Sequence, residues 1–173
     1  MSASFEFSEV DSVTIGTIGE PGQRTFYLQA RRGTQLLTLK LEKQQVGALA
    51  QMLLELLEDL PTLERVPGDE APPLEEPVLA EWAVGAMQLA YDSGNDRLVL
   101  LAEEIEVVDE QGDPVQSGGL ARLVVTRVQA AAMAERGEEL VTSGRPHCPL
   151  CGSPLDPEGH ACPKTNGHGP PHR

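Results

Sequence analysis

The chain has 173 residues, so it offers a body of roughly 140 residues, which is large enough to bury a core without disulfide bonds, and a short appendage. Its formal net charge of −14 argues against a general binder of nucleic acid or of anionic membranes, because phosphate binding needs clustered lysine and arginine. The N-terminus lacks the basic flank and apolar run of a signal peptide, and no apolar stretch approaches the ~18 residues of a membrane span, so we expect a cytoplasmic protein.

The first sixty residues predict three strands followed by one helix. The strands are expected at Val13–Ile18, Arg24–Ala30 and Gln35–Leu41, with turns at the glycines between them. A helix is predicted from Lys43 to Leu60, because its apolar residues recur at helical spacing and form one stripe. Pro61 follows this stripe and ends the helix.

Residues 61–77 contain five prolines among acidic residues, which predicts an exposed and mobile linker. After it, three more strands are expected at Glu81–Tyr91, Arg97–Val108 and Leu120–Val125. A second helix is predicted from Arg127 to Val141, with Thr126 as its N-cap.

The two halves of the chain resemble each other. At an offset of 84 residues, Leu41–Val46 falls on Val125–Ala130, where each segment joins a strand to a helix. We therefore expect an α+β fold in which two β-β-β-α units pack as one pseudo-twofold domain. The predicted organisation is a first unit at residues 1–60, the linker at 61–77, a second unit at 78–144, and a C-terminal zinc knuckle and tail at 145–173.

The C-terminal tail concentrates the residues that can bind a metal. All three cysteines and all four histidines lie between His147 and His172. Cys148-x-x-Cys151 followed by a glycine is typical of half of a zinc site, because the backbone turns so that both sulfurs face one point. The same pair could instead be a redox couple, but it does not open a helix after a strand as such couples do.

The second half of the predicted site is His160-x-Cys162. In an extended segment, residues i and i+2 point the same way, so this histidine and cysteine can converge on one ion. Three sulfurs and one nitrogen favour zinc as the cofactor. His160 is the preferred fourth ligand, with His168 and His147 as alternatives. Four protein ligands close the coordination shell, which is typical of a structural zinc ion.

The tail and several segments of the body together resemble a known family. They include Gly16–Gly19, Pro21–Ala30 and Gly144–Pro146, and the tail motifs Cys148-Pro-Leu-Cys151 and Gly159-His-x-Cys-Pro163. With these motifs the chain resembles the bacterial, actinobacterial-type domain of unknown function 3090 family over nearly its whole length. The resemblance implies a bacterial cytoplasmic protein with a Cys/His tail.

The sequence favours a non-catalytic binding or adaptor protein that presents the zinc knuckle to a protein partner. The acidic run Glu103, Glu104 and Glu106 has no nearby histidine or lysine, so we expect it to face solvent. Trp82 is expected in the core. One alternative function is an enzyme with a small-molecule site in the cleft between the two units. Another is nucleic-acid binding through the knuckle, which the acidic body disfavours.

Overall fold

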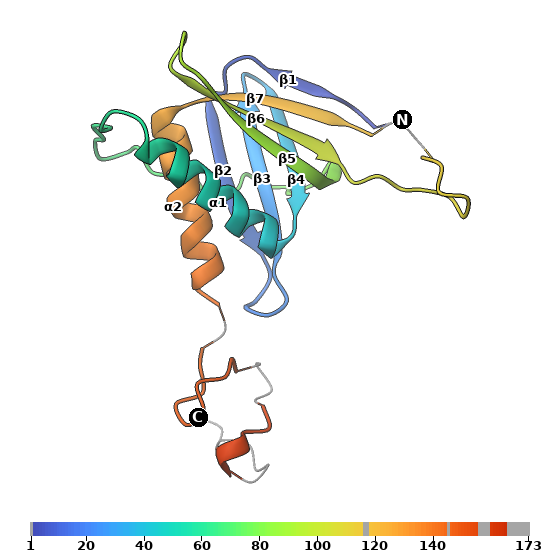
Figure 1. Cartoon of the computed structure of the whole chain (residues 1–173), viewed down its shortest axis with the longest axis vertical. Helices are drawn as coiled ribbons and strands as arrows, with labels where there is room; N and C mark the ends of the chain where they lie inside the picture. The colour runs from blue at the N-terminus through green and yellow to red at the C-terminus, as the bar shows by residue number, and fades with distance from the viewer. Residues whose placement is uncertain (1, 116–117, 145, 156–159, 166–173) are drawn as a thin grey trace.

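The computed structural model describes residues 2–115, 118–144, 146–155 and 160–165. Seven strands form one sheet in the order β1-β7-β6-β5-β4-β3-β2, with two helices packed against it (Figure 1). The strands are β1 (Phe5–Phe7), β2 (Ser12–Ile18), β3 (Thr25–Arg32), β4 (Gln35–Leu41), β5 (Trp82–Asp92), β6 (Arg97–Glu104) and β7 (Leu120–Thr126). The helices are α1 (Lys43–Glu58) and α2 (Arg127–Thr142), and a short 3-10 helix η1 (Pro163–Thr165) lies in the tail.

The α+β class and the two successive β-β-β-α units are as predicted. The last strand of each unit pairs in parallel with the segment that leads into the first strand of the other. β4 pairs with the start of β5 through Leu39 and Trp82, and β7 pairs with β1 through Leu123 and Phe7. Leu39 and Leu123 are 84 residues apart, which is the offset at which the two halves of the sequence match. These equivalent pairings support the predicted pseudo-twofold arrangement of the two units.

The core lies between the sheet and the two helices and is almost entirely aliphatic. Val46, Leu49 and Leu53 of α1 are completely buried, as the helical stripe predicted. In α2, the small Gly137 lets α1 approach closely, since an added Cβ would lie 3.3 Å from the Cβ of Ala50. Trp82, at the start of β5, is 5% exposed, which confirms its predicted place in the core.

Helix α2 begins where the sequence predicts. The Thr126 side chain accepts a hydrogen bond from the backbone N–H of Gln129, and the Gln129 side chain in turn accepts one from the backbone N–H of Thr126. This reciprocal pair satisfies two donors that a helix start leaves without partners. It fixes the point at which the chain leaves β7 and turns over the sheet.

The segment between α1 and β5, expected to be an exposed and mobile linker, is largely exposed, but its residues 72–75 pack on the sheet. The buried Gln29 side chain donates to the carbonyl oxygen of Glu75 at 3.0 Å and accepts from its backbone N–H at 2.8 Å. Thr14 donates a hydrogen bond to the carbonyl oxygen of Pro72 at 2.5 Å. Gly16 makes room for Leu74, whose Cγ would lie 2.4 Å from an added Cβ. We call residues 72–75 the strap, because they cover polar side chains of β2 and β3.

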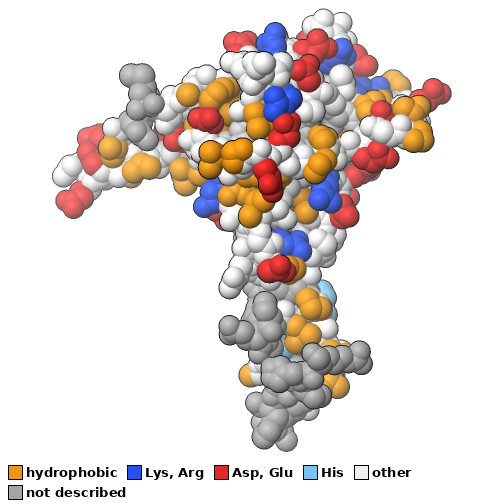
Figure 2. All heavy atoms as spheres, turned by 180° about the vertical axis from the view of Figure 1, so that it is seen from behind, with side chains coloured by type: hydrophobic (Ala, Val, Ile, Leu, Met, Phe, Trp, Pro, Cys, Tyr) orange, Lys and Arg blue, Asp and Glu red, His pale blue; other side chains and the backbone are white. Residues whose placement is uncertain are grey.

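The short strand β1 was not predicted. It pairs in parallel with β7, so the N-terminus of the chain completes the edge of the second unit and not of the first. Figure 2 shows acidic side chains spread over the surface of the body, as its charge requires. Within the described residues, no helix is long and apolar enough to cross a membrane.

Candidate metal centre

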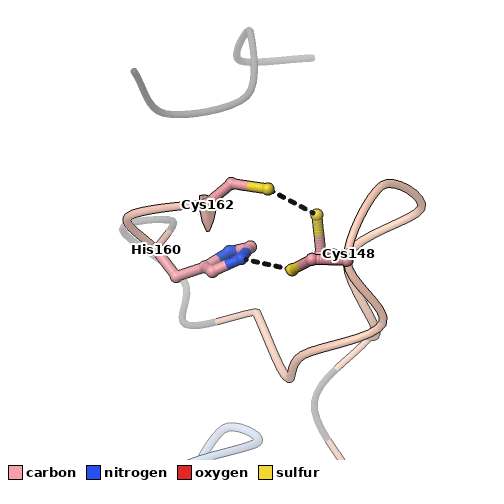
Figure 3. Close-up of side chains that lie close together, drawn as sticks. Cys148, His160 and Cys162 are labelled. Atoms are coloured by element: carbon pink, nitrogen blue, oxygen red, sulfur yellow. Dashed lines mark hydrogen bonds between the residues drawn. The ribbon is translucent and has the colours of Figure 1, made fainter. Parts of the chain in front are cut away.

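The structure brings together the four side chains that the sequence singled out in the tail. The ligand atoms of Cys148, Cys151, His160 and Cys162 all lie within 4.8 Å of one another. The sulfurs of Cys148 and Cys162 are 3.9 Å apart, and Nε2 of His160 lies 3.1 Å from the sulfur of Cys151 (Figure 3). Because two residues come from each half of the motif, the cluster ties the two ends of the knuckle together.

A tight turn positions the first pair of cysteines. The backbone N–H of Gly152 donates to the carbonyl oxygen of Cys148 at 2.8 Å, and the N–H of Cys148 donates to the carbonyl of Ser153 at 2.8 Å. Gly152 has a φ of 75°, a left-handed conformation that a residue with a Cβ adopts only with strain. The glycine after the second cysteine is therefore required by the turn, and the turn presents both sulfurs on one side.

The second pair lies in a stretch without helix or strand that leads into η1. His160 and Cys162 are separated by one residue, and both side chains reach the same cluster, as their spacing predicted (Figure 3). Cys162 is fully buried and Cys148 is 2% exposed. Cys151 and His160 are half-buried, so the cluster is partly shielded from solvent.

The thiols of Cys151 and Cys162 have different proton affinities. The pKa of Cys151 is lowered to about 6 by hydrogen bonds from the hydroxyl and the backbone N–H of Ser153 and by His160. Burial raises the pKa of Cys162, while a hydrogen bond from the backbone N–H of Lys164 acts in the opposite direction. Backbone N–H groups two residues beyond a cysteine thus point at two of the sulfurs. Such N–H groups stabilise negative charge on sulfur, which a metal-bound thiolate carries.

Two other histidines, His147 and His168, were alternatives for the fourth ligand. His147 is exposed and is not part of the cluster, although its backbone forms an isolated bridge with Pro154. His168, the other alternative for the fourth ligand, lies outside the described residues. Among the residues that are described, His160 is the histidine that joins the three cysteines.

The donor set determines what this cluster can do. Three thiolates and an imidazole within one small sphere fit zinc, and they fill a tetrahedral shell without leaving a position for substrate or water. In the described part of the chain, no carboxylate joins the group as a possible base. The arrangement is therefore suited to stabilising the fold of the knuckle.

The acidic run Glu103, Glu104 and Glu106, at the end of β6 and just beyond it, was expected to face solvent, and two of its three side chains do so. Glu103 and Glu106 are exposed, whereas Glu104 accepts a hydrogen bond from the backbone N–H of Gly119 at 2.8 Å. Hydrogen bonds from Ser2 and Gly119 lower the pKa of Glu104. Glu104 therefore has a structural role at the base of the β6–β7 connection.

A cavity of about 220 Å³ lies where the two units meet, at the end of the body from which the tail leaves. It is lined by Pro21, Gly22, Arg24, Phe26, Lys43, Leu140 and Gly144. Arg24 donates to the carbonyl oxygens of Leu140 and Ser143, at 3.2 and 3.0 Å, and so satisfies the last turn of α2. The lining contains no carboxylate, thiol or imidazole, so the cavity lacks the groups expected of an acid–base or nucleophilic active site.

The fold and the cluster together define the chain as an α+β protein with a C-terminal Cys3His cluster. The sequence model of the family described as "Protein of unknown function (DUF3090)" matches residues 5–162, so the chain belongs to this family, as its motifs indicated. No curated protein and no solved structure matches the chain.

Proposed function

We propose that Cys148, Cys151, His160 and Cys162 bind one zinc ion, and that the protein is a non-catalytic adaptor whose zinc knuckle contacts a protein partner. The observation that carries this proposal is the closed Cys3His cluster itself. A closed site gives the metal a structural role, because catalysis at zinc requires an open coordination position. Reduced thiolates of this kind persist in a reducing compartment, which supports a cytoplasmic protein.

The position of the knuckle supports a role in recognition. It extends away from the sheet and helices (Figure 1), and its described backbone hydrogen bonds are internal. Leu150, in the turn between the first two cysteines, is 47% exposed. An apolar side chain held out on a rigid turn is a suitable contact for a partner protein. Zinc would then fix the shape of the surface that the partner recognises.

The charge of the chain favours a protein partner over nucleic acid. In the described part of the knuckle, Lys164 is the single basic side chain, so it offers no cluster for phosphate. The body adds a strongly acidic surface that would repel the nucleic-acid backbone. Recognition through Leu150 and the exposed turn residues requires no such cluster.

A cross-linking pull-down tests the proposal. The full-length protein, Cys151→Ser and Leu150→Ser are used as baits in lysate of the source organism, with His147→Ala as the matched control because His147 is exposed and outside the cluster. We expect one partner to be captured by the wild type and by His147→Ala and to be lost from both other variants. Undiminished capture by Cys151→Ser and Leu150→Ser would show that the knuckle is not the recognition surface.

A further inference from the structure

The connection between β6 and β7 forms a projecting arm, which we define as residues 105–115 together with 118–119. At its base, the backbone N–H of Glu104 donates to the carbonyl oxygen of Gly119 at 2.8 Å. Further out, the N–H of Val115 donates to the carbonyl of Val107 at 2.8 Å, and Val108 bridges to Pro114. The arm is thus an ordered hairpin, and it extends well beyond the sheet (Figure 1).

The arm and the start of β7 carry a concentration of exposed apolar side chains. Ile105, Val107, Val108, Val115 and Leu120 are 42–61% exposed. They are five of the nine large hydrophobic residues that are exposed in the described parts of the chain. Figure 2 shows apolar side chains along the projecting segment, with acidic ones near its end. Apolar side chains scattered singly need no explanation, but a cluster of this kind marks an interaction surface.

The base of the arm is hollow and acidic. A hollow of about 580 Å³ is lined by Gly85, Ala86, Glu103, Glu104, Glu106, Gly118, Gly119 and Leu120. The side chains of Glu103 and Glu106 make no hydrogen bond or ion pair with any described residue. No lysine or arginine occurs between Arg97 and Arg122. Glu103 and Glu106 therefore line the hollow, and neither forms an ion pair with a described lysine or arginine.

We infer that the arm and its acidic hollow bind a basic segment of a partner protein, in which lysine or arginine alternates with aliphatic residues. The aliphatic side chains would cover the exposed valines, while the cations would pair with Glu103 and Glu106. Charge decides between this occupant and the alternatives. A second copy of the chain would bring the same acidic residues against them, and an anionic membrane would be repelled. This surface would be a second contact of the proposed adaptor, and it does not depend on the zinc site.

The test uses a defined probe, a fluorescein-labelled nine-residue peptide of alternating lysine and valine, with fluorescence anisotropy and the full-length protein. We expect the peptide to bind the wild type and to bind Val107→Ser/Val115→Ser and Glu103→Gln/Glu106→Gln at least about tenfold more weakly. All four side chains are exposed, and the hydrogen bond between Val107 and Val115 joins backbone atoms that the substitutions leave in place. Both variants should therefore fold, which circular dichroism checks.

Matched controls are Val66→Ser and Glu58→Gln, which change an exposed valine and an exposed glutamate elsewhere and should alter the affinity less than about twofold. Cys151→Ser should also bind the peptide normally, which separates this inference from the proposed zinc function. No binding at about 1 mM peptide, unchanged binding by the arm variants, or equal binding of a glutamate–valine peptide would overturn it. So would self-association or binding to anionic phosphatidylglycerol vesicles that the arm variants abolish.

Discussion

Replacing Cys151 with serine is expected to remove the zinc ion from the knuckle while the body keeps its stability. The reason lies in how the two parts contact each other. The hydrophobic core cluster extends only as far as Val141, and the buried Cys148 and Cys162 are not part of it. In the described residues, the backbone hydrogen bonds of the knuckle join only knuckle residues. Loss of the metal should therefore be a local event.

The magnitudes follow from the ligand count and from the size of the body. Structural zinc contributes about 10–16 kcal/mol to a small knuckle, or about 2.5–4 kcal/mol for each of four ligands. Loss of one ligand should thus weaken zinc binding roughly 100- to 1000-fold. A substitution outside the core changes the free energy of unfolding of the body by less than about 0.5 kcal/mol, which shifts Tm by about 2 °C or less.

Two assays separate these effects. Competition with a chromophoric chelator measures zinc affinity, and calorimetry measures the unfolding of the body, with His147→Ala as the control in both. A fall in Tm of more than about 5 °C for Cys151→Ser would refute the independence of the knuckle from the body. Unchanged zinc affinity would refute the assignment of Cys151 as a ligand.

Three further predictions concern the body. Gln29→Leu removes the two hydrogen bonds between Gln29 and Glu75 of the strap and should lower the free energy of unfolding by about 2–4 kcal/mol in urea denaturation, whereas replacement of the exposed Gln35 by leucine should have little effect. The Arg31 guanidinium lowers the pKa of Glu75, so the stability from this pair is complete above the unfolded pKa and is lost as pH falls through the lower folded pKa. Glu75→Gln should accordingly show a shallower loss of stability than the wild type below about pH 4.3, and equal slopes would contradict this. Thr126→Ala, which removes the cap of α2, should cost about 1 kcal/mol by the same denaturation, and a change near zero would contradict the capping.

The local elements could be predicted from the sequence because their signals are local. The stripe formed by Val46, Leu49 and Leu53 gives the face of α1, and Thr126 marks the start of α2. The four residues of the cluster could be identified for the same reason, since both cysteine-containing motifs lie within 15 residues of one another. Spacing alone was enough to suggest which side chains meet.

Long-range contacts could not be predicted in this way. Prolines at 72 and 73 indicate a linker. Nothing in the local sequence shows that the side chain of Gln29, more than forty residues earlier, forms hydrogen bonds with the backbone of Glu75. The parallel pairing of β4 with β5, and its counterpart between β7 and β1, likewise depend on distant parts of the chain, although the repeat in the sequence predicted two equivalent units. Gly16 can be read from the sequence, but only the structure shows that its missing side chain leaves space for Leu74 of the strap.

The most direct test of the zinc site is elemental analysis of the full-length protein, purified without chelator under reducing conditions. The cluster of Cys148, Cys151, His160 and Cys162 predicts about one zinc per chain. It also predicts that this zinc is absent from a Cys148→Ser/Cys162→Ser variant prepared in the same way. A wild-type protein without bound metal, or a double variant that retains a full equivalent of zinc, would contradict the assignment.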